Sequence, residues 1–378
     1  MVARGQLELA RRKVQRVRLG LHPARDDRGD LERRLLRGRA GARRGHLFPT
    51  STATRPQERN QEESRDRGSS DHHVRQPRRK KPTPPSSFRL LTLEIVSRVV
   101  TLPNEGRLIL ATDLQGNVRD FQALERIYED AARKPGGAVL VISGDLVHGP
   151  ELAANEWPDH LGTYYHGDSP ELIRRARALA DRHPGRVHFL MGNHEHAHVG
   201  GPVVSKFFPN EAERLESLLG EEGTRALRAW IASWPFVAMA PSAGLAMTHA
   251  APHAPISSAE DLERLALAAD ADDPNDLDGR AIMIALLWAR TTSSDRARAF
   301  LRALDDRLTV SIYGHDVAHR GFAIDREPLL CLSTSFGCHD GDKLYLSWDL
   351  SVHAESAAHV ASVGLHPLYP EAAKIHRL

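Results

Sequence analysis

Polar residues of the kind that bind metal ions stand at the ends of five short apolar runs along the chain. They are Asp113, Asp145, Asn193 with His194, His249 and His315. One such residue would indicate little, because Asp, Asn and His also begin turns and cap helices. Five in succession favour a shared site, since the carboxyl ends of strands converge in α/β sheets. Carboxylates, an amide oxygen and imidazoles suit two divalent metal ions, with one carboxylate able to bridge them.

The elements that must position these residues follow a repeated pattern from residue 89 onward. Short β-branched runs alternate with amphipathic segments, which predicts a layered α/β domain. Helix starts are expected at Ser169-Pro170 and at Asn210, with Glu213 three residues on. Strands are expected at 107–113, 138–145, 186–194, 244–250, 309–315, 321–325, 329–336 and 343–350. Helices are expected at 171–183, 211–220, 224–234, 279–290 and 294–307.

Charge divides the chain into unlike parts. Residues 1–89 carry 24 Lys and Arg against 10 Asp and Glu, whereas residues 90–378 carry 27 against 39. The first part has few large apolar residues, so we expect a basic, disordered extension over 1–89. A folded domain over 90–355 and a C-terminal tail over 356–378 would follow. An Arg-rich arm could bind nucleic acid or anionic lipid, but a solvated tail is the favoured interpretation.

The sequence predicts a cytoplasmic protein with no membrane segment. No stretch approaches the roughly 20 apolar residues that span a bilayer, and the N-terminus has no apolar stretch like that of a signal peptide. Two cysteines, Cys331 and Cys338, make no disulfide framework. The sequence does not indicate an oligomeric state.

Five motifs resemble those of a known family. "TDLQGN", "SGDLVHG", "MGNHEH", "THAAP" and "YGHDVAHRGF" are similar, in order, to the D-x-H, G-D, G-N-H-E, H and G-H motifs of the calcineurin-like metallophosphoesterases. Within that superfamily the chain most resembles the phosphoprotein phosphatases for serine and threonine, over about residues 106–350. The resemblance implies a four-layer α/β/β/α sandwich of two mixed sheets, with a dinuclear metal site at the carboxyl ends of the strands.

The resemblance also implies roles for the strand-end residues. Asp113 would bind the first metal and Asp145 would bridge both. Asn193, His249 and His315 would complete the second metal site, and His194 would be the general acid. A water bridging the metals would then attack phosphorus in line with the leaving oxygen. Mn²⁺ is the expected metal, with Fe, Zn or Mg as alternatives, and the substrate would be a phosphoprotein or a small phosphoester.

Three positions depart from the family pattern. Gln115 stands where the pattern has a histidine ligand, and its amide oxygen would be a weaker ligand. His148 replaces the aspartate that orients the acid histidine, and Gly149 replaces the arginine that grips phosphate. Arg290 and Arg119 are candidate replacements for that arginine.

Further histidines could also reach the substrate. His148 and His196 are weaker candidates for contacting it, as is His198.

Two other functions stay open at this stage. One is hydrolysis of nucleotides or dinucleoside polyphosphates, because losing the arginine weakens the inference to protein substrates. The other is a degenerate phosphoesterase fold that binds without catalysis, which Gln115 and His148 suggest.

Overall fold

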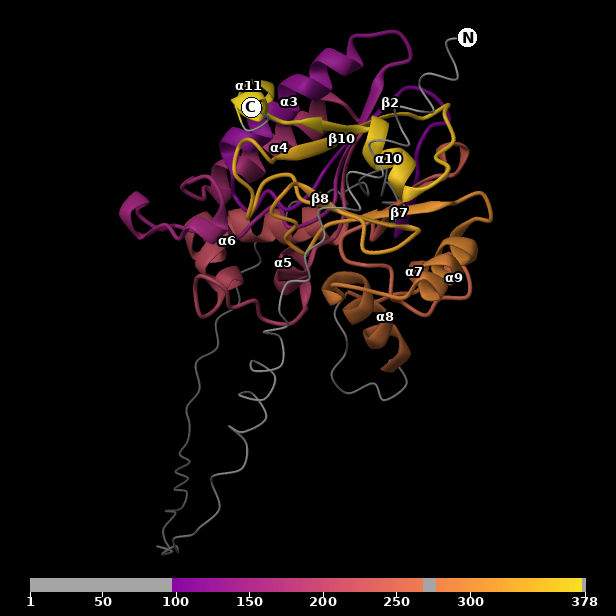
Figure 1. Ribbon diagram of the computed structural model, residues 1–378. Coiled ribbons are helices and arrows are strands. Elements are labelled where there is room, and N and C mark those ends of the chain that lie inside the picture. Colours follow the sequence, from indigo (N-terminus) through magenta and orange to yellow (C-terminus); the bar gives the residue numbers. More distant parts are fainter. Residues whose placement is uncertain (1–96, 268–276, 376–378) are drawn as a thin grey trace, which may run out of the picture. The chain divides into compact units, whose positions relative to one another are not determined.

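The computed structural model describes residues 97–267 and 277–375 (Figure 1). The basic extension expected over 1–89 lies outside the described residues. Elements carry the labels of Figure 1.

One mixed sheet has five strands in the order β11-β10-β2-β3-β4. Strands β2, β3 and β4 are parallel, and β10 is antiparallel to both β2 and β11. The bounds are β2 Arg107–Ala111, β3 Ala138–Ile142, β4 Val187–Phe189, β10 Leu344–Asp349 and β11 Leu365–Pro367.

A second mixed sheet has six strands in the order β1-β5-β6-β7-β9-β8. Strand β7 is parallel to both β6 and β9, which places the carboxyl ends of β6 and β7 at one edge. The bounds are β1 Val99–Thr101, β5 Val237–Ala240, β6 Leu245–Thr248, β7 Val310–Tyr313, β8 Phe322–Ala323 and β9 Leu329–Leu332.

Helices connect the strands and cover the outer faces of the sheets. In Figure 1, α3 and α4 lie beside the five-stranded sheet, while α8 and α9 lie on the opposite side of the molecule. The α-helices are α3 Val118–Ala132, α4 Ser169–Arg182, α5 Asn193–His196, α6 Glu211–Ala232, α7 Glu260–Glu263, α8 Leu277–Trp288, α9 Ser294–Leu304, α10 Ala357–Val363 and α11 Pro370–Ile375. Short 3₁₀ turns are η1 Ala154–Glu156, η2 Asp159–Leu161, η3 Ala197–Val199 and η4 Pro241–Ala243.

Strand β2 shows why the layers form. Successive side chains of a strand point to opposite faces. Leu108 and Leu110 therefore pack with Met247 and Ile312 between the two sheets, whereas Ile109 packs with Phe121 of α3. The apolar run buries both faces of β2, and the four-layer α/β/β/α sandwich is confirmed.

Some expected boundaries differ in the structure. Asp168, rather than Ser169, caps α4, because its carboxylate accepts a hydrogen bond from the backbone N–H of Glu171. Asn210 caps α6 as expected, and the two helices predicted after it form one helix with a kink at Gly220. Residues 357–375 do not form a separate tail, since β11 pairs with β10 and completes the sheet.

A buried ion pair ties α3 to the C-terminal part of the chain. Lys343 Nζ lies 2.8 Å from Asp120 Oδ2, and both residues are buried. Ser335, Tyr369 and Asn117 also donate hydrogen bonds to the Asp120 carboxylate. The pair thereby fixes the start of α3, which directly follows the loop carrying Asp113 and Gln115.

We expect Lys343→Met to lower the free energy of unfolding by about 3–5 kcal/mol, because it leaves the Asp120 carboxylate buried without its cation. Urea denaturation of the metal-free protein measures this. Lys134→Met at an exposed turn is the control, for which a change within about 0.5 kcal/mol is expected. An equal effect of the two substitutions would contradict the importance of the buried pair.

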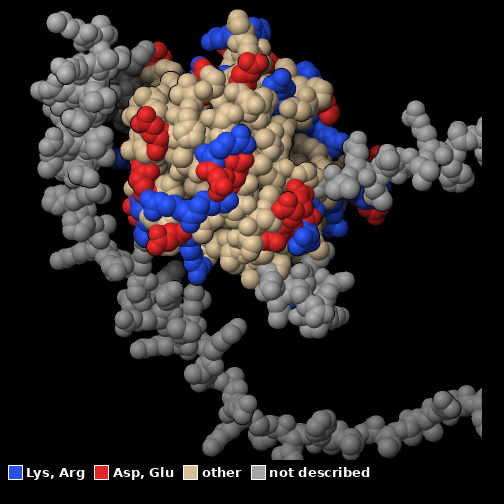
Figure 2. Space-filling view, turned by 90° about the vertical axis from the view of Figure 1, so that its right-hand side faces the viewer, with Lys and Arg blue, Asp and Glu red and all other residues tan. Residues whose placement is uncertain are grey.

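Among residues 97–267 and 277–375, no helix is long and apolar enough to cross a membrane. On the face shown in Figure 2, acidic and basic side chains lie beside one another in small groups. That face therefore has no extensive basic surface of the kind that attracts a nucleic-acid backbone.

Candidate active site

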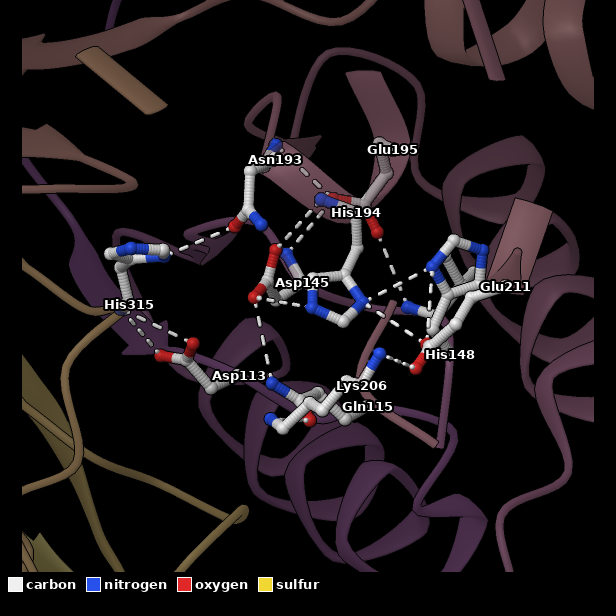
Figure 3. A network of polar contacts seen from close by, with 12 residues as sticks. Asp113, Gln115, Asp145, His148, Asn193, His194, Glu195, Lys206, Glu211 and His315 are labelled. Carbon is white, nitrogen blue, oxygen red and sulfur yellow. Dashed lines mark hydrogen bonds and ion pairs between the residues drawn. The ribbon is translucent and has the colours of Figure 1, made fainter. Parts of the chain in front are cut away.

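Five strand ends from both sheets deliver the candidate ligands to one place (Figure 3). In the five-stranded sheet, Asp113 follows β2, Asp145 follows β3, and Asn193 with His194 follows β4. In the six-stranded sheet, His249 follows β6 and His315 follows β7. All of these residues are buried except His315, which is half-buried.

The tightest part of the site is a group of four side chains from these strand ends. The amide oxygen of Asn193 lies 3.0 Å from His249 Nε2 and 3.0 Å from His315 Nδ1. His249 Nε2 is also 3.3 Å from Asp145 Oδ1. Ligand atoms of Asp145, His249 and His315 all lie within 4.8 Å of one another.

The tautomer of His249 shows that this group fits a cation. His249 Nδ1 lies 2.9 Å from the backbone oxygen of Ser143, which can only accept, so Nδ1 carries the proton. In the neutral ring, Nε2 then carries a lone pair, which faces two other acceptors, the amide oxygen of Asn193 and the carboxylate of Asp145. Three acceptors aimed at one another are stabilised by a cation between them. A carboxylate, an amide oxygen and two imidazoles are suitable ligands for Mn²⁺, Fe or Zn²⁺.

The backbone is strained at the site. Among the described residues other than glycine, positive φ angles occur at five positions, and each is a residue of the site. They are Asp113 (51°), Gln115 (41°), Asp145 (51°), His148 (65°) and His315 (65°). Such conformations cost on the order of 1–3 kcal/mol each and persist only where the surroundings impose them. The fold therefore gives up stability to aim these side chains inward.

Two glycines permit the close packing of the ligand loops. A Cβ at Gly144 would lie 2.5 Å from His249 Nδ1, and one at Gly314 would lie 2.3 Å from Asp113 Oδ2. Neither contact is sterically allowed, so larger residues would displace the candidate ligands themselves.

Burial and mutual repulsion raise the pKa of the acidic groups. Desolvation raises the pKa of Asp113, and the nearby charge of Asp145 raises it further. The pKa of Asp145 is also raised, chiefly by burial. Burial lowers the pKa of His315. For the two carboxylates, the shift reflects negative charge that is costly in a buried site without a cation. The His315 shift favours its neutral ring, which is the form that binds metal ions.

Glu195 holds the Asp145 loop in place. Its carboxylate accepts hydrogen bonds from the backbone N–H groups of Asp145, Leu146, Val147 and Gly192, at 2.9–3.2 Å. Both carboxylate oxygens are thereby used, which agrees with a supporting role for Glu195 and leaves ligation to its neighbours.

The Gln115 side chain is turned away from the arrangement that a metal ligand needs. Its amide oxygen accepts a hydrogen bond from Lys206 Nζ at 2.9 Å. Its amide nitrogen faces Asp145 Oδ2 at 3.5 Å. Asp113 accepts hydrogen bonds from the backbone N–H of His315 at 3.1–3.2 Å.

His194 belongs to a chain of three imidazoles. His194 Nδ1 lies 3.1 Å from His148 Nδ1, and His148 Nε2 lies 2.9 Å from His198 Nε2. His198 Nδ1 in turn lies 2.9 Å from Glu216, which also pairs with Arg228. Because the Glu216 carboxylate only accepts, it sets the protonated nitrogen of each neutral ring in turn. The His194 proton then sits on Nδ1, and Nε2 is free toward Asp145, 3.6 Å away.

Burial lowers the pKa of His194 and His148 well below the ordinary histidine value. For His194 the neighbouring His148 is the next cause. To act as a general acid, His194 must therefore first take up a proton on Nε2, which faces Asp145, because Nδ1 is the nitrogen that contacts the imidazole chain.

Glu211 links this network to the loop before α6. Its carboxylate lies 3.6 Å from His148 Nδ1 and 3.8 Å from His194 Nδ1. It also accepts hydrogen bonds from the backbone N–H groups of Lys206 and Phe207. His148, His194 and Glu211 place donor atoms within 4.8 Å of one another, but the hydrogen bonds between the rings favour a network over a second metal group.

The two candidate arginines each pair with a carboxylate. Arg119 pairs with Asp340 and stacks on Tyr369, so its charge is used elsewhere. Arg290 is exposed and pairs with Asp316, beside His315.

His196 is also directed away from the strand-end residues. Its Nε2 bonds the backbone oxygen of Leu267. Among these weaker candidates, the structure brings only His148 into direct contact with His194.

Lys206 and Glu211 are the site residues that the sequence did not indicate. Lys206 lies in the loop 200–210, which follows the third motif, and Glu211 directly after this loop is the first residue of α6. A lysine five residues before a buried glutamate carries no recognisable spacing signal, so only the fold reveals them.

Comparison with known proteins agrees with the strand-end geometry. Residues 106–332 match the profile of the calcineurin-like phosphoesterase family. The chain belongs to this family.

Solved structures give weaker likenesses. A protein serine/threonine phosphatase from Saccharomyces cerevisiae is 14% identical, with 67% of this chain and 76% of that chain covered and a TM-score of 0.46. A putative diadenosine tetraphosphatase is 19% identical, with 63% and 87% covered and a TM-score of 0.34. A metallophosphoesterase from Sphaerobacter thermophilus is 14% identical, with 65% and 84% covered and a TM-score of 0.36. No curated protein gave a significant match.

Proposed function

We propose that this calcineurin-like phosphoesterase is a metal-dependent hydrolase that acts on phosphoproteins at serine or threonine. The observation that carries the hydrolase activity is the group of Asp145, Asn193, His249 and His315, whose acceptor atoms converge on one point. A divalent ion held there would act as a Lewis acid on phosphoryl oxygen and would lower the pKa of water.

The chain's own residues supply the rest of the chemistry. Once it has taken up a proton on Nε2, His194 would transfer that proton to the leaving oxygen, because its Nδ1 is held by His148. Glu195 keeps Asp145 in position through the backbone of its loop. Asp113 is the candidate ligand on the side of Gln115.

The protein-substrate assignment rests on the order and content of the five motifs. The runner-up substrates are nucleotides and dinucleoside polyphosphates, and a degenerate binding protein is the alternative without catalysis. Because Gly149 stands where the family pattern has a phosphate-binding arginine, the experiment below also tests the runner-up substrates. A Cβ there would lie 2.2 Å from the backbone oxygen of Gln115, so no phosphate-binding side chain fits.

We expect chelation to abolish activity and Mn²⁺ to restore it. The measurement is kcat/KM on p-nitrophenyl phosphate, a phosphoserine peptide, ATP and diadenosine tetraphosphate, with metal content determined on the same samples. A phosphopeptide preferred over both nucleotides supports the proposal, and the reverse preference supports the runner-up. A protein that binds Mn²⁺ but hydrolyses none of the four would contradict a catalytic function.

A further inference from the structure

Lys206 is held at the site by contacts from three directions. Its backbone N–H and that of Phe207 donate to the buried carboxylate of Glu211 at 3.0 and 2.6 Å. Its Nζ donates to the Gln115 amide oxygen at 2.9 Å and lies 3.5 Å from the centroid of the Phe336 ring. These contacts set the position of the ammonium group, although the residue as a whole remains exposed.

The ammonium group has no carboxylate of its own. Among residues 97–267 and 277–375, no acidic oxygen pairs with Lys206 Nζ within 4.0 Å. The charges of Asp145, Asp113 and Glu211 nevertheless act on it from nearby. Arg290, by contrast, is neutralised by Asp316 at 2.8 Å. Lys206 is thus the cation beside the strand-end residues whose charge is still available to a phosphoryl group.

Gln115 explains how this lysine can take a metal's place. In the family pattern this position is a histidine ligand of the first metal. Here the Gln115 amide oxygen, the one atom able to bind that metal, is directed to Lys206 instead. The amide nitrogen faces Asp145, where it would oppose a metal ion.

We propose that the Lys206 ammonium group replaces the first metal ion of the family, so that the chain binds one divalent ion and Lys206 binds the substrate's phosphoryl group. This inference rests on the proposed function, because it assigns a role within the same site. It also revises the expectation of two metal ions.

Metal stoichiometry tests the first half of the inference. Wild type, Lys206→Ala and the double variant Lys206→Ala/Gln115→His are saturated with Mn²⁺, and metal per chain is measured after removal of free ions. The expected values are one ion for wild type and for Lys206→Ala, and two for the double variant, which removes the competing cation and adds an imidazole. Two ions in wild type, with phosphatase activity, would overturn this inference alone. A wild type that binds no Mn²⁺ overturns the proposed function as well.

Phosphate binding and kinetics test the second half. Removing one preorganised electrostatic contact lowers the rate by about 10²–10³-fold, so Lys206→Ala is expected to lower kcat/KM on p-nitrophenyl phosphate by that factor. It should also weaken the binding of inorganic phosphate to the Mn²⁺-loaded protein, while Lys206→Arg should retain part of both.

Lys134→Ala is the matched control, because Lys134 is exposed and uses only its backbone in hydrogen bonds to Ala131 and Gly137. If Lys206→Ala behaves like Lys134→Ala in both assays, Lys206 does not contact the phosphoryl group.

Discussion

Replacement of Asp145 by asparagine is expected to lower kcat/KM by about 10³–10⁴-fold, with loss of bound Mn²⁺. Asp145 lies beside His249, His194 and Gln115, so it contacts both halves of the site. A metal supplies several kcal/mol of transition-state stabilisation, and each 1.36 kcal/mol changes the rate tenfold. The checks are kcat/KM on p-nitrophenyl phosphate and metal content by elemental analysis.

The same substitution, which lowers activity, should raise the stability of the metal-free protein. Burial raises the Asp145 pKa above 3.8, so the folded state binds more protons than the unfolded state as pH rises above that value. Stability then falls with rising pH, and removing the carboxylate removes part of this loss. In a chelator at pH 7–8, Asp145→Asn should therefore have a higher urea midpoint than wild type. A lower midpoint would show that Asp145 is structural, and its loss of activity would then not identify a ligand.

Replacement of His194 by glutamine is expected to lower kcat by about 10²–10⁴-fold, the usual contribution of a general acid. Metal content should stay at the wild-type value, because His194 is not one of the residues that converge on Asn193. This combination separates His194 from Asp145, whose loss removes the metal. Stopped-flow or steady-state kinetics with parallel metal analysis measures both quantities. Loss of metal from His194→Gln would assign His194 to ligation.

The imidazole chain behind His194 gives a second readout of the same role. Glu216→Gln replaces a pure acceptor with a group that also donates, so the tautomers of His198, His148 and His194 are no longer fixed. Loss of such a supporting partner typically costs about 10–100-fold, which we expect in kcat, with KM little changed. Glu213→Gln, at an exposed position on the same helix, is the control and should leave kcat unchanged.

Local sequence patterns predicted much of the fold and of the candidate site. The apolar runs and the polar residues that end them predicted the layered fold and the group Asp113, Asp145, Asn193, His249 and His315, because strand periodicity and strand-end ligands are properties of short segments. The helix start at Asn210 followed from one capping residue for the same reason. The start at Ser169 was placed one residue late, since the preceding Asp168 supplies an equally good capping oxygen.

Only the tertiary structure decided what surrounds those ligands. Gln115 carries no sign in the sequence that its amide oxygen is directed to Lys206, which is 91 residues away along the chain. Likewise, His148 meets His198 and Glu211 because the loops after β3 and β4 pack against the start of α6. Short segments fix which residue ends a strand, but the partner of a side chain depends on the packing of distant loops. The sequence therefore predicted the candidate metal ligands, and the packing of the loop 200–210 decided which cation stands beside them.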